Sequence, residues 1–217
     1  MTSITILGGS GQQGRGLAQR LAQAGLNVLV GSRDPDRARA AVAGWPRPDL
    51  PIEVADNASS VDGADLIVLA VPFPSVDELL RELQPHFKDG ALVIDVTVPV
   101  TFASGKMAMI EVAEGSASEH VRARLPAAVR LAAAFKTLPA HLLGATGDPL
   151  DCDEFVCGDS EGARAEAAAL VNLLPGVRAI DVGPLSRARS IEHLTALAIA
   201  INRRHKVHDA RFRIVGL

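Results

Sequence analysis

The sequence is poor in cysteine, in net charge and in long apolar runs, and each shortage argues against one class of protein. Its two cysteines, Cys152 and Cys157, are too few for a disulfide framework and have no Cys or His partners at zinc-binding spacing. We therefore interpret both as structural thiols flanking a strand, with no metal site. A net charge of -3 gives no electrostatic reason to bind nucleic acid. There is no apolar run of about 18 residues, and the N-terminus has no signal-peptide pattern, so we expect a cytoplasmic protein.

The sequence does contain enough apolar residues for a substantial core, because 48% of its 217 residues are hydrophobic. Its first segment, residues 4–14, is an apolar run that ends in glycines and leads into a helical pattern. Gly9, Gly11 and Gly14 have the spacing of a dinucleotide-binding loop. In that interpretation the first glycine allows a tight turn, the second lets the backbone approach a pyrophosphate, and the third lets the helix pack closely on the strand. Free N–H groups at the start of the helix then face the anion.

The second predicted strand, at residues 27–31, lacks the acidic residue that binds the adenosine ribose in NAD-dependent relatives of this fold. Ser32 and Arg33 follow it instead. A hydroxyl donor and a guanidinium suit a 2′-phosphate, so we predict NADP in preference to NAD. Arg37 lies four residues further on and could close over the same phosphate or the adenine. The alternative is that Arg33 and Arg37 are an ordinary solvated pair.

Strand and helix patterns alternate without interruption up to residue 95. We predict strands at 52–54, 65–71 and 91–95, and helices that begin at Pro35, near Asp56 and at Val76. This alternation indicates an α/β fold, a Rossmann-type doubly wound parallel sheet. Ligands bind such sheets at the carboxyl ends of the strands, which here carry Phe73 and the segment 96–100. Phe73 could lie against a cofactor ring or pack on its own helix.

The pattern becomes less regular after residue 96. We predict a loop that contains Lys106 and Met107, and then a helix from Ser116, which has Glu119 at capping-box spacing. Later segments predict strands at 129–135, 154–158 and 177–182, and helices at 161–173 and 186–203. The last helix is so apolar that it must be buried, under the sheet or against a second subunit. We thus expect an NADP-binding domain at 1–135, a smaller C-terminal α/β part at 136–217 that completes a second pocket, and a homodimer.

Several segments closely resemble the NADPH-dependent coenzyme F420 reductases, and the likeness covers essentially the whole chain. The glycine loop and Gly183-Pro184-Leu185 are shared with a wider superfamily that includes eukaryotic metalloreductases. The helix start at Gly115-Ser116-Ala117 is typical of a narrower group of proteins. Some relatives carry histidine where this chain has Lys136. The segments that carry the resemblance are 7–11, 31–33, 98–100, 115–117, 135–140, 151–159 and 181–185, with Glu192 following.

The resemblance implies reversible hydride transfer between carbon 4 of the nicotinamide and carbon 5 of the deazaflavin ring of coenzyme F420. Thr195 would approach the two rings from the last helix. No side-chain acid or base is required, because the two cofactors supply the reactivity. By position, the residues that would hold NADP are Ser10, Gly11, Gln12, Gln13, Ser32, Arg33 and Arg37. Those that would flank the stacked rings are Phe73, Val98, Leu138 and Ala140, together with the adjoining Pro72 and Pro99.

Two rival functions remain open. An NADPH-dependent reductase of a carbonyl, imine, flavin or metal would need a proton donor, for which Lys136, His141 and His193 are candidates. A non-catalytic NADP(H) sensor would instead use the apolar last helix to bind a partner. The basic cluster at 203–206 either complements the dipole of that helix or meets the anionic tail of coenzyme F420.

Overall fold

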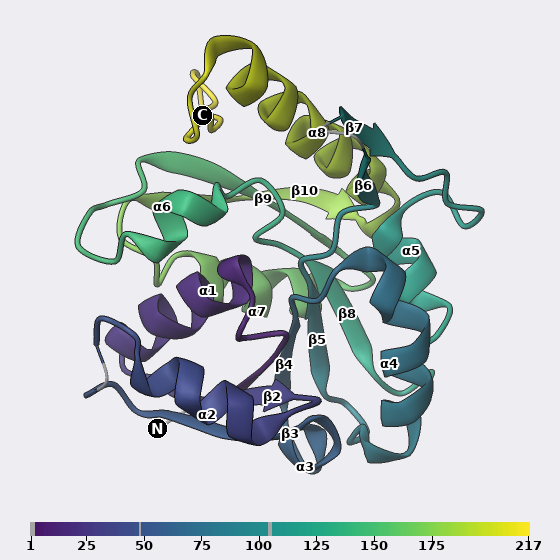
Figure 1. Cartoon of the computed structure of the whole chain (residues 1–217). Coiled ribbons are helices and arrows are strands. Elements are labelled where there is room, and N and C mark those ends of the chain that lie inside the picture. Colours follow the sequence, from purple (N-terminus) through teal and green to yellow (C-terminus); the bar gives the residue numbers. More distant parts are fainter. Residues whose placement is uncertain (1–2, 48, 104–105) are drawn as a thin grey trace.

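A single eight-stranded sheet forms the centre of the computed structural model, which describes residues 3–47, 49–103 and 106–217 (Figure 1). Its strands, in chain order, are β1 (Ser3–Leu7), β2 (Asn27–Ser32), β3 (Ile52–Asp56), β4 (Leu66–Leu69), β5 (Leu92–Asp95), β8 (Arg130–Ala133), β9 (Cys152–Gly158) and β10 (Val177–Pro184). They lie side by side in the order β10-β9-β8-β5-β4-β1-β2-β3. The six strands from β3 to β8 are parallel, so their carboxyl ends meet at one edge. The predicted Rossmann-type sheet is confirmed.

Helices cover both faces of the sheet and close two hydrophobic cores. Apolar side chains of α1 and α7 pack on one face, and those of α3, α4 and α5 pack on the other. Burying a strand on both faces explains why β4 is wholly aliphatic and β5 is aliphatic up to its last residue, Asp95. The helices are α1 (Gln12–Gln23), α2 (Pro35–Ala43), α3 (Asn57–Val61), α4 (Val76–Leu83), α5 (Ala117–Arg122), α6 (Ala140–Gly144), α7 (Glu161–Val171) and α8 (Ala188–His205).

Local signals explain where several helices begin. Asp34 accepts a hydrogen bond from the amide of Arg37 and so caps α2, whose first residue is Pro35. Ser116 caps α5 by accepting from the amide of Glu119 at 3.1 Å, as the capping-box spacing predicts. The sequence pattern was therefore sufficient to place both helix starts.

The strand β9 runs antiparallel to β8, with Ala133 opposite Cys157, and β10 runs parallel to β9. Buried strands of either direction have the same apolar pattern, so the sequence did not indicate this reversal. Both cysteines lie inside β9 and not beside it. Burial raises the pKa of Cys152 to about 11 and that of Cys157 to about 12, which keeps both as unreactive thiols.

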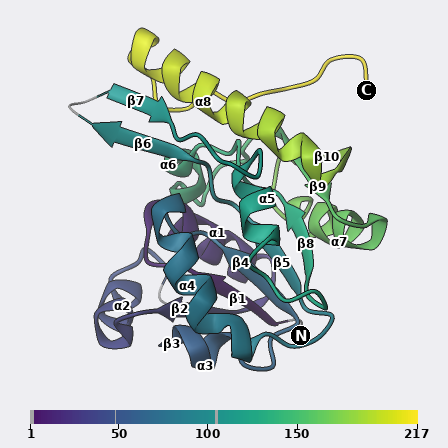
Figure 2. The same ribbon diagram turned by 90° about the vertical axis from the view of Figure 1, so that its right-hand side faces the viewer.

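A β-hairpin stands where the sequence predicted a loop. It consists of β6 (Val100–Ala103) and β7 (Lys106–Met109), which pair antiparallel with Phe102 opposite Met107. Residues 104–105 of the predicted loop lie outside the described residues. The hairpin is a separate two-stranded sheet and lies next to α8 in both views (Figures 1 and 2). Each of its strands is only four residues long, so the alternating pattern of a strand is short and weak there.

The last helix, α8, is only partly buried. It crosses above the carboxyl edge of the sheet (Figure 2) and buries Ala188, Ile191 and Ala198. Leu197 and Ile201 of its outer side are 50% and 37% exposed, so the rest of the chain does not bury this side, and its burial against a second subunit stays a prediction. No helix in the described ranges has both the length and the hydrophobicity needed to cross a membrane.

Helix α1 is joined tightly to α6, a helix that the sequence did not predict. A Cβ atom at Gly16 would come within 2.5 Å of Leu143, so only glycine permits this approach. The side chain of Arg20 is buried beside it and donates four hydrogen bonds to backbone carbonyls. These belong to Leu142, Leu143, Ala145 and Asp148, at 2.8, 3.0, 2.6 and 3.1 Å. The glycine-loop helix and the C-terminal part are thereby fastened together.

Candidate active site

Two adjoining cavities open at the carboxyl edge of the parallel strands. The first, of about 430 Å³, lies over the glycine loop and the end of β2. The second, of about 800 Å³, lies between the loops after β4, β5 and β8 and the inner face of α8. Gly11 and residues 70–72 line both cavities, which therefore meet at the start of α1. An elongated ligand with two chemically different ends fits this arrangement.

The glycine loop turns sharply between β1 and α1. Gly8 has φ +80°, and a Cβ atom there would lie 2.6 Å from the carbonyl oxygen of Ala70. The conformation that only glycine adopts easily is thus at Gly8, not at Gly9 as the motif predicted. Gly9 instead leaves room for Val30, because its Cβ atom would come within 2.8 Å of that side chain. A Cβ atom at Gly14 would lie 2.5 Å from the Gly8 oxygen, so the predicted close helix packing is present.

The N-terminus of α1 offers free amide groups to an anion. Its N-cap residue is Gly11, which has no side chain to cap the helix, and its first turn carries no acidic residue. The caps of α2 and α5, by contrast, are supplied by Asp34 and Ser116. The first-turn N–H groups and the helix dipole together favour a negatively charged group at this point. Ser10 and Gly11 line the first cavity beside it.

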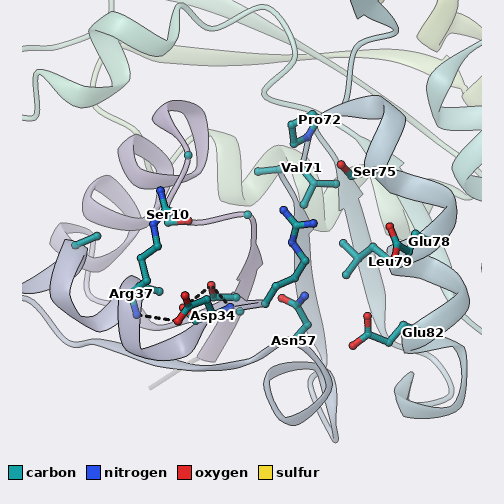
Figure 3. A pocket seen from close by; sticks show the side chains of 18 residues that line it. Ser10, Asp34, Arg37, Asn57, Val71, Pro72, Ser75, Glu78, Leu79 and Glu82 are labelled. Carbon is teal, nitrogen blue, oxygen red and sulfur yellow. Dashed lines mark hydrogen bonds between the residues drawn. The ribbon is translucent and has the colours of Figure 1, made fainter.

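Two arginines line the first cavity beyond the end of β2. In the described part of the chain, Arg33 and Arg37 form no ion pair, although most other arginines are paired with carboxylates. The Arg37 side chain extends toward Ser10 on one side of the cavity, and Glu78 and Glu82 stand on α4 at the other (Figure 3). The Ser32 hydroxyl donates to the Asp34 carbonyl at 3.0 Å, which shapes the turn between them.

The second cavity has mainly apolar walls. Phe73, Val98 and Thr195 line it, from the loop after β4, the loop after β5 and α8, respectively. Pro99 is buried in the same loop as Val98 but lines neither cavity. No carboxylate of the described residues lines this space. Of the residues that the sequence proposed for cofactor binding, those on its walls are Gly11, Gln12, Gln13, Pro72, Phe73, Val98, Leu138, Ala140 and Thr195.

Phe73 lies on the cavity wall and also packs on a neighbouring helix. Its ring centre is 5.0 Å from that of His120 in α5, with the rings tilted by 57°. The imidazole bridges Glu114 and Asp77, at 3.0 and 2.7 Å, so it is held in place. The ring contact of Phe73 is thus with α5 and not with its own helix, and its predicted contact with a cofactor ring stays a prediction.

The loop after β8 forms the floor of the second cavity and is held from three directions. Phe135 is fully buried with φ +58°, and its carbonyl accepts from Gln13 Nε2 at 2.8 Å. The carbonyl of Lys136 accepts from the Thr195 hydroxyl at 2.9 Å. The carboxylate of Glu154, at the start of β9, accepts from the amide of Lys136 at 2.9 Å and from the Thr137 hydroxyl at 2.6 Å. Such a network fixes the loop before any ligand binds.

Beneath this loop lies a buried ionic cluster that the sequence analysis did not identify. The ammonium group of Lys136 is fully buried, 2.8 Å from Asp95 and 3.3 Å from Glu192. Burial alone would lower the pKa of Lys136, but the two carboxylates outweigh it and raise the pKa, so the group stays charged. Asp95 also accepts from Ser118 at 2.6 Å. These groups lie far apart in the sequence, and only the presence of Glu192 in the family-like segments hinted at its role.

The outer end of the second cavity is formed by His141, Asn202 and His208. The two imidazole centres are 6.2 Å apart. The basic residues at 203–206 do not line the cavity. Three of them lie in the last turn of α8, and Lys206 is its C-cap residue. They are placed to complement its dipole. His193 is exposed, lines neither cavity, and bonds to the Arg189 carbonyl at 2.6 Å.

Comparison with known proteins agrees with this geometry. Residues 3–99 match the family described as NADP oxidoreductase coenzyme F420-dependent. The chain is 40% identical to the F420-dependent NADP reductase of Methanothermobacter thermautotrophicus, over 99% of this chain and 95% of that one, and 32% identical to that of Methanocaldococcus jannaschii, over 99% and 98%. A crystal structure of a candidate F420-dependent NADP reductase from Arthrobacter sp. FB24 superimposes with a TM-score of 0.84 at 28% identity, covering 99% of this chain and all of that one. The chain belongs to the family of F420-dependent NADP reductases.

Proposed function

We propose that the protein transfers a hydride reversibly between NADPH and the deazaflavin coenzyme F420. The observation that carries the proposal is the continuity of the two cavities: within the described parts of the chain, one contains two arginines without ion pairs, and the other is mainly apolar and lined by no carboxylate. When bound, the two rings supply the hydride donor and the hydride acceptor. The chain itself binds the rings, orients them and excludes water.

The first cavity would hold the phosphates and adenosine of NADP, within the part at 1–135. The uncapped N-terminus of α1 suits the pyrophosphate. Arg33 and Arg37 suit a 2′-phosphate, since both guanidinium groups are free to form charge-assisted hydrogen bonds. Ser32 would add a hydroxyl donor by exchanging its bond to Asp34 for one to the phosphate.

The second cavity would hold the nicotinamide and the deazaflavin face to face, completed by the part at 136–217. Phe73, Val98 and Leu138 present apolar surface to planar rings, and Thr195 approaches from α8. Of the described residues that line the cavity, Lys136 has its ammonium paired with Asp95 and Glu192, and His141 and His208 lie together beside Asn202 at the outer end. Hydride transfer between two bound rings needs proximity more than acid–base catalysis.

The direct test is a spectrophotometric assay with NADPH that follows the loss of the deazaflavin absorption of coenzyme F420. We expect rapid bleaching with NADPH and F420 together. NADH in place of NADPH, and flavin mononucleotide in place of F420, serve as controls and should give little turnover. NADPH binding without bleaching would contradict the proposed function.

Two rival functions make different predictions. A carbonyl or imine reductase needs a proton donor, so the His141→Ala variant would lose activity with NADP affinity intact; we expect normal turnover of F420. A non-catalytic sensor would bind NADPH, turn over no acceptor, and change its oligomeric state with a partner.

We also propose that the protein is a cytoplasmic homodimer. Support comes from apolar side chains exposed on α8 and the adjacent hairpin, where Phe102 is 65% and Leu197 50% exposed. Light scattering after size-exclusion chromatography should give twice the mass of one chain. The Leu197→Glu variant should then run as a monomer.

A further inference from the structure

Thr97 lies in the loop after β5 with its backbone fully engaged. Its amide donates to Asp95 Oδ1 at 2.9 Å, and its carbonyl accepts a short hydrogen bond from the Lys136 ammonium. Only 3% of the residue is exposed. Because the ionic cluster of Asp95 and Lys136 is buried and charged, it fixes the position of Thr97 more firmly than an ordinary loop would.

Thr97 lines the second cavity, and its buried hydroxyl has no hydrogen-bond partner among the described residues. The other two buried threonines of the described residues are satisfied: Thr5 donates to the Ser60 carbonyl, and Thr137 to Glu154, both at 2.6 Å. A buried hydroxyl without a partner costs stability, and one that is rigidly held beside a cavity is placed to meet a ligand.

We propose that Thr97 is a binding residue, whose hydroxyl forms a hydrogen bond with an amide-type carbonyl group of a planar ring in the second cavity. This inference rests on the proposed function, which supplies two such rings. The carboxamide of nicotinamide and the dione of the deazaflavin both carry this chemistry. Most of the wall is apolar, and the hydroxyls of Thr137 and Thr195 on it already donate to Glu154 and to the Lys136 carbonyl, so the uncommitted hydroxyl of Thr97 would contribute strongly to ring orientation.

The test is the Thr97→Val variant, which removes the hydroxyl and keeps the shape of the side chain. We expect its melting temperature to equal or exceed that of the parent protein, since an unpaired buried group is lost. We expect ring binding to weaken by about tenfold. Thr97→Ser, which keeps the hydroxyl, should retain most of the affinity.

The matched control is Thr5→Val, which removes a satisfied buried hydroxyl far from both cavities. It should lower the melting temperature and leave binding unchanged. A ligand-binding hydroxyl is recognised by weaker binding without a lower melting temperature. A structural hydroxyl is recognised by a lower melting temperature without weaker binding.

Two measurements identify the ring. A higher dissociation constant for NADP in the absence of F420 supports the nicotinamide carboxamide as the partner, whereas an unchanged NADP constant with a higher KM for F420 supports the deazaflavin carbonyl. If neither value changes in Thr97→Val, the inference is overturned and water satisfies the hydroxyl. Failure of the proposed function is recognised separately, because the parent protein would then bleach no F420 while its NADP affinity could still be compared.

Discussion

The two cavities differ in where their charges lie. The first is near the surface, and its charged side chains, including Arg33 and Arg37, are exposed. The second has mainly apolar walls, and its charges lie beneath the wall, where Asp95, Lys136 and Glu192 neutralise one another in part. Exposed charges are screened by solvent and contribute little rigidity, whereas a buried ionic cluster fixes the backbone around it.

Filling the apolar cavity should have the largest effect. The Val98→Trp variant places an indole where the rings would stack, so we expect hydride transfer to be abolished, a loss of more than about 100-fold. NADP affinity should remain mostly intact, because the phosphate end is untouched. Single-turnover kinetics and NADP titration measure the two separately, and unchanged turnover would mean that Val98 is not at the junction of the rings.

Removing the buried cation should mainly affect stability. Lys136→Met leaves Asp95 and Glu192 buried without compensation, which we expect to lower the free energy of unfolding by about 3–5 kcal/mol. Lys88→Met is the matched control, since Lys88 pairs with Asp65 on the surface at 2.6 Å, and it should cost about 1 kcal/mol or less. Urea unfolding of both variants provides the comparison. Equal losses would show that the buried cluster is no more important than a surface pair.

The pH dependence of stability should reveal Glu154. Burial raises its pKa to about 7, against a reference value of 4.5, despite the hydrogen bonds from Thr137 and Lys136, which oppose the shift. The folded protein therefore keeps this proton up to about pH 7, while the unfolded chain loses it near pH 4.5. The contribution favours folding most below pH 4.5 and is lost as the pH rises through 7.

The free energy of unfolding of the parent protein should fall between pH 4.5 and 7. We expect this fall to be about 1–3 kcal/mol smaller in the Glu154→Gln variant, whose side chain cannot titrate. Urea denaturation at several pH values, with the parent protein in parallel, measures this slope. A slope identical in both proteins would exclude Glu154 as its source.

Reversing a charge at the phosphate end should have the smallest effect. Arg33→Glu should weaken NADPH binding by about 1–2 kcal/mol, because the side chain is exposed and solvent screens it. NADH, which lacks the 2′-phosphate, should bind almost as before. Equal losses for the two dinucleotides, measured by fluorescence titration, would contradict the 2′-phosphate assignment.

The first cavity was the more predictable end, because the residues that build it are close in sequence. The glycine loop, Ser32, Arg33 and the proline that begins α2 are all local signals, and the structure places them together. The helix cap at Ser116 was equally predictable from the sequence. A pattern with a period of two or of 3.6 residues is enough to find such elements.

The second cavity was only partly predictable, because its supports are non-local. Glu154 reaches the loop after β8 because β9 pairs antiparallel with β8. The direction of a buried strand cannot be predicted from its apolar sequence pattern. The Lys136 ammonium meets Asp95 and Glu192 across 41 and 56 positions of sequence. The segment around Lys136 could be recognised by resemblance, but its partners could not.

The seam between α1 and α6 has a consequence for the walls of the second cavity. Arg20 is desolvated and satisfied only by carbonyls of the C-terminal part, and Gln13 ties the same helix to the loop after β8. Moving α6 away from α1 would break these four hydrogen bonds and open the close contact at Gly16, at a cost of several kcal/mol even with water in their place. The cavity walls that α1 and the loop after β8 contribute are therefore held in one relative position by the fold, before any ligand binds.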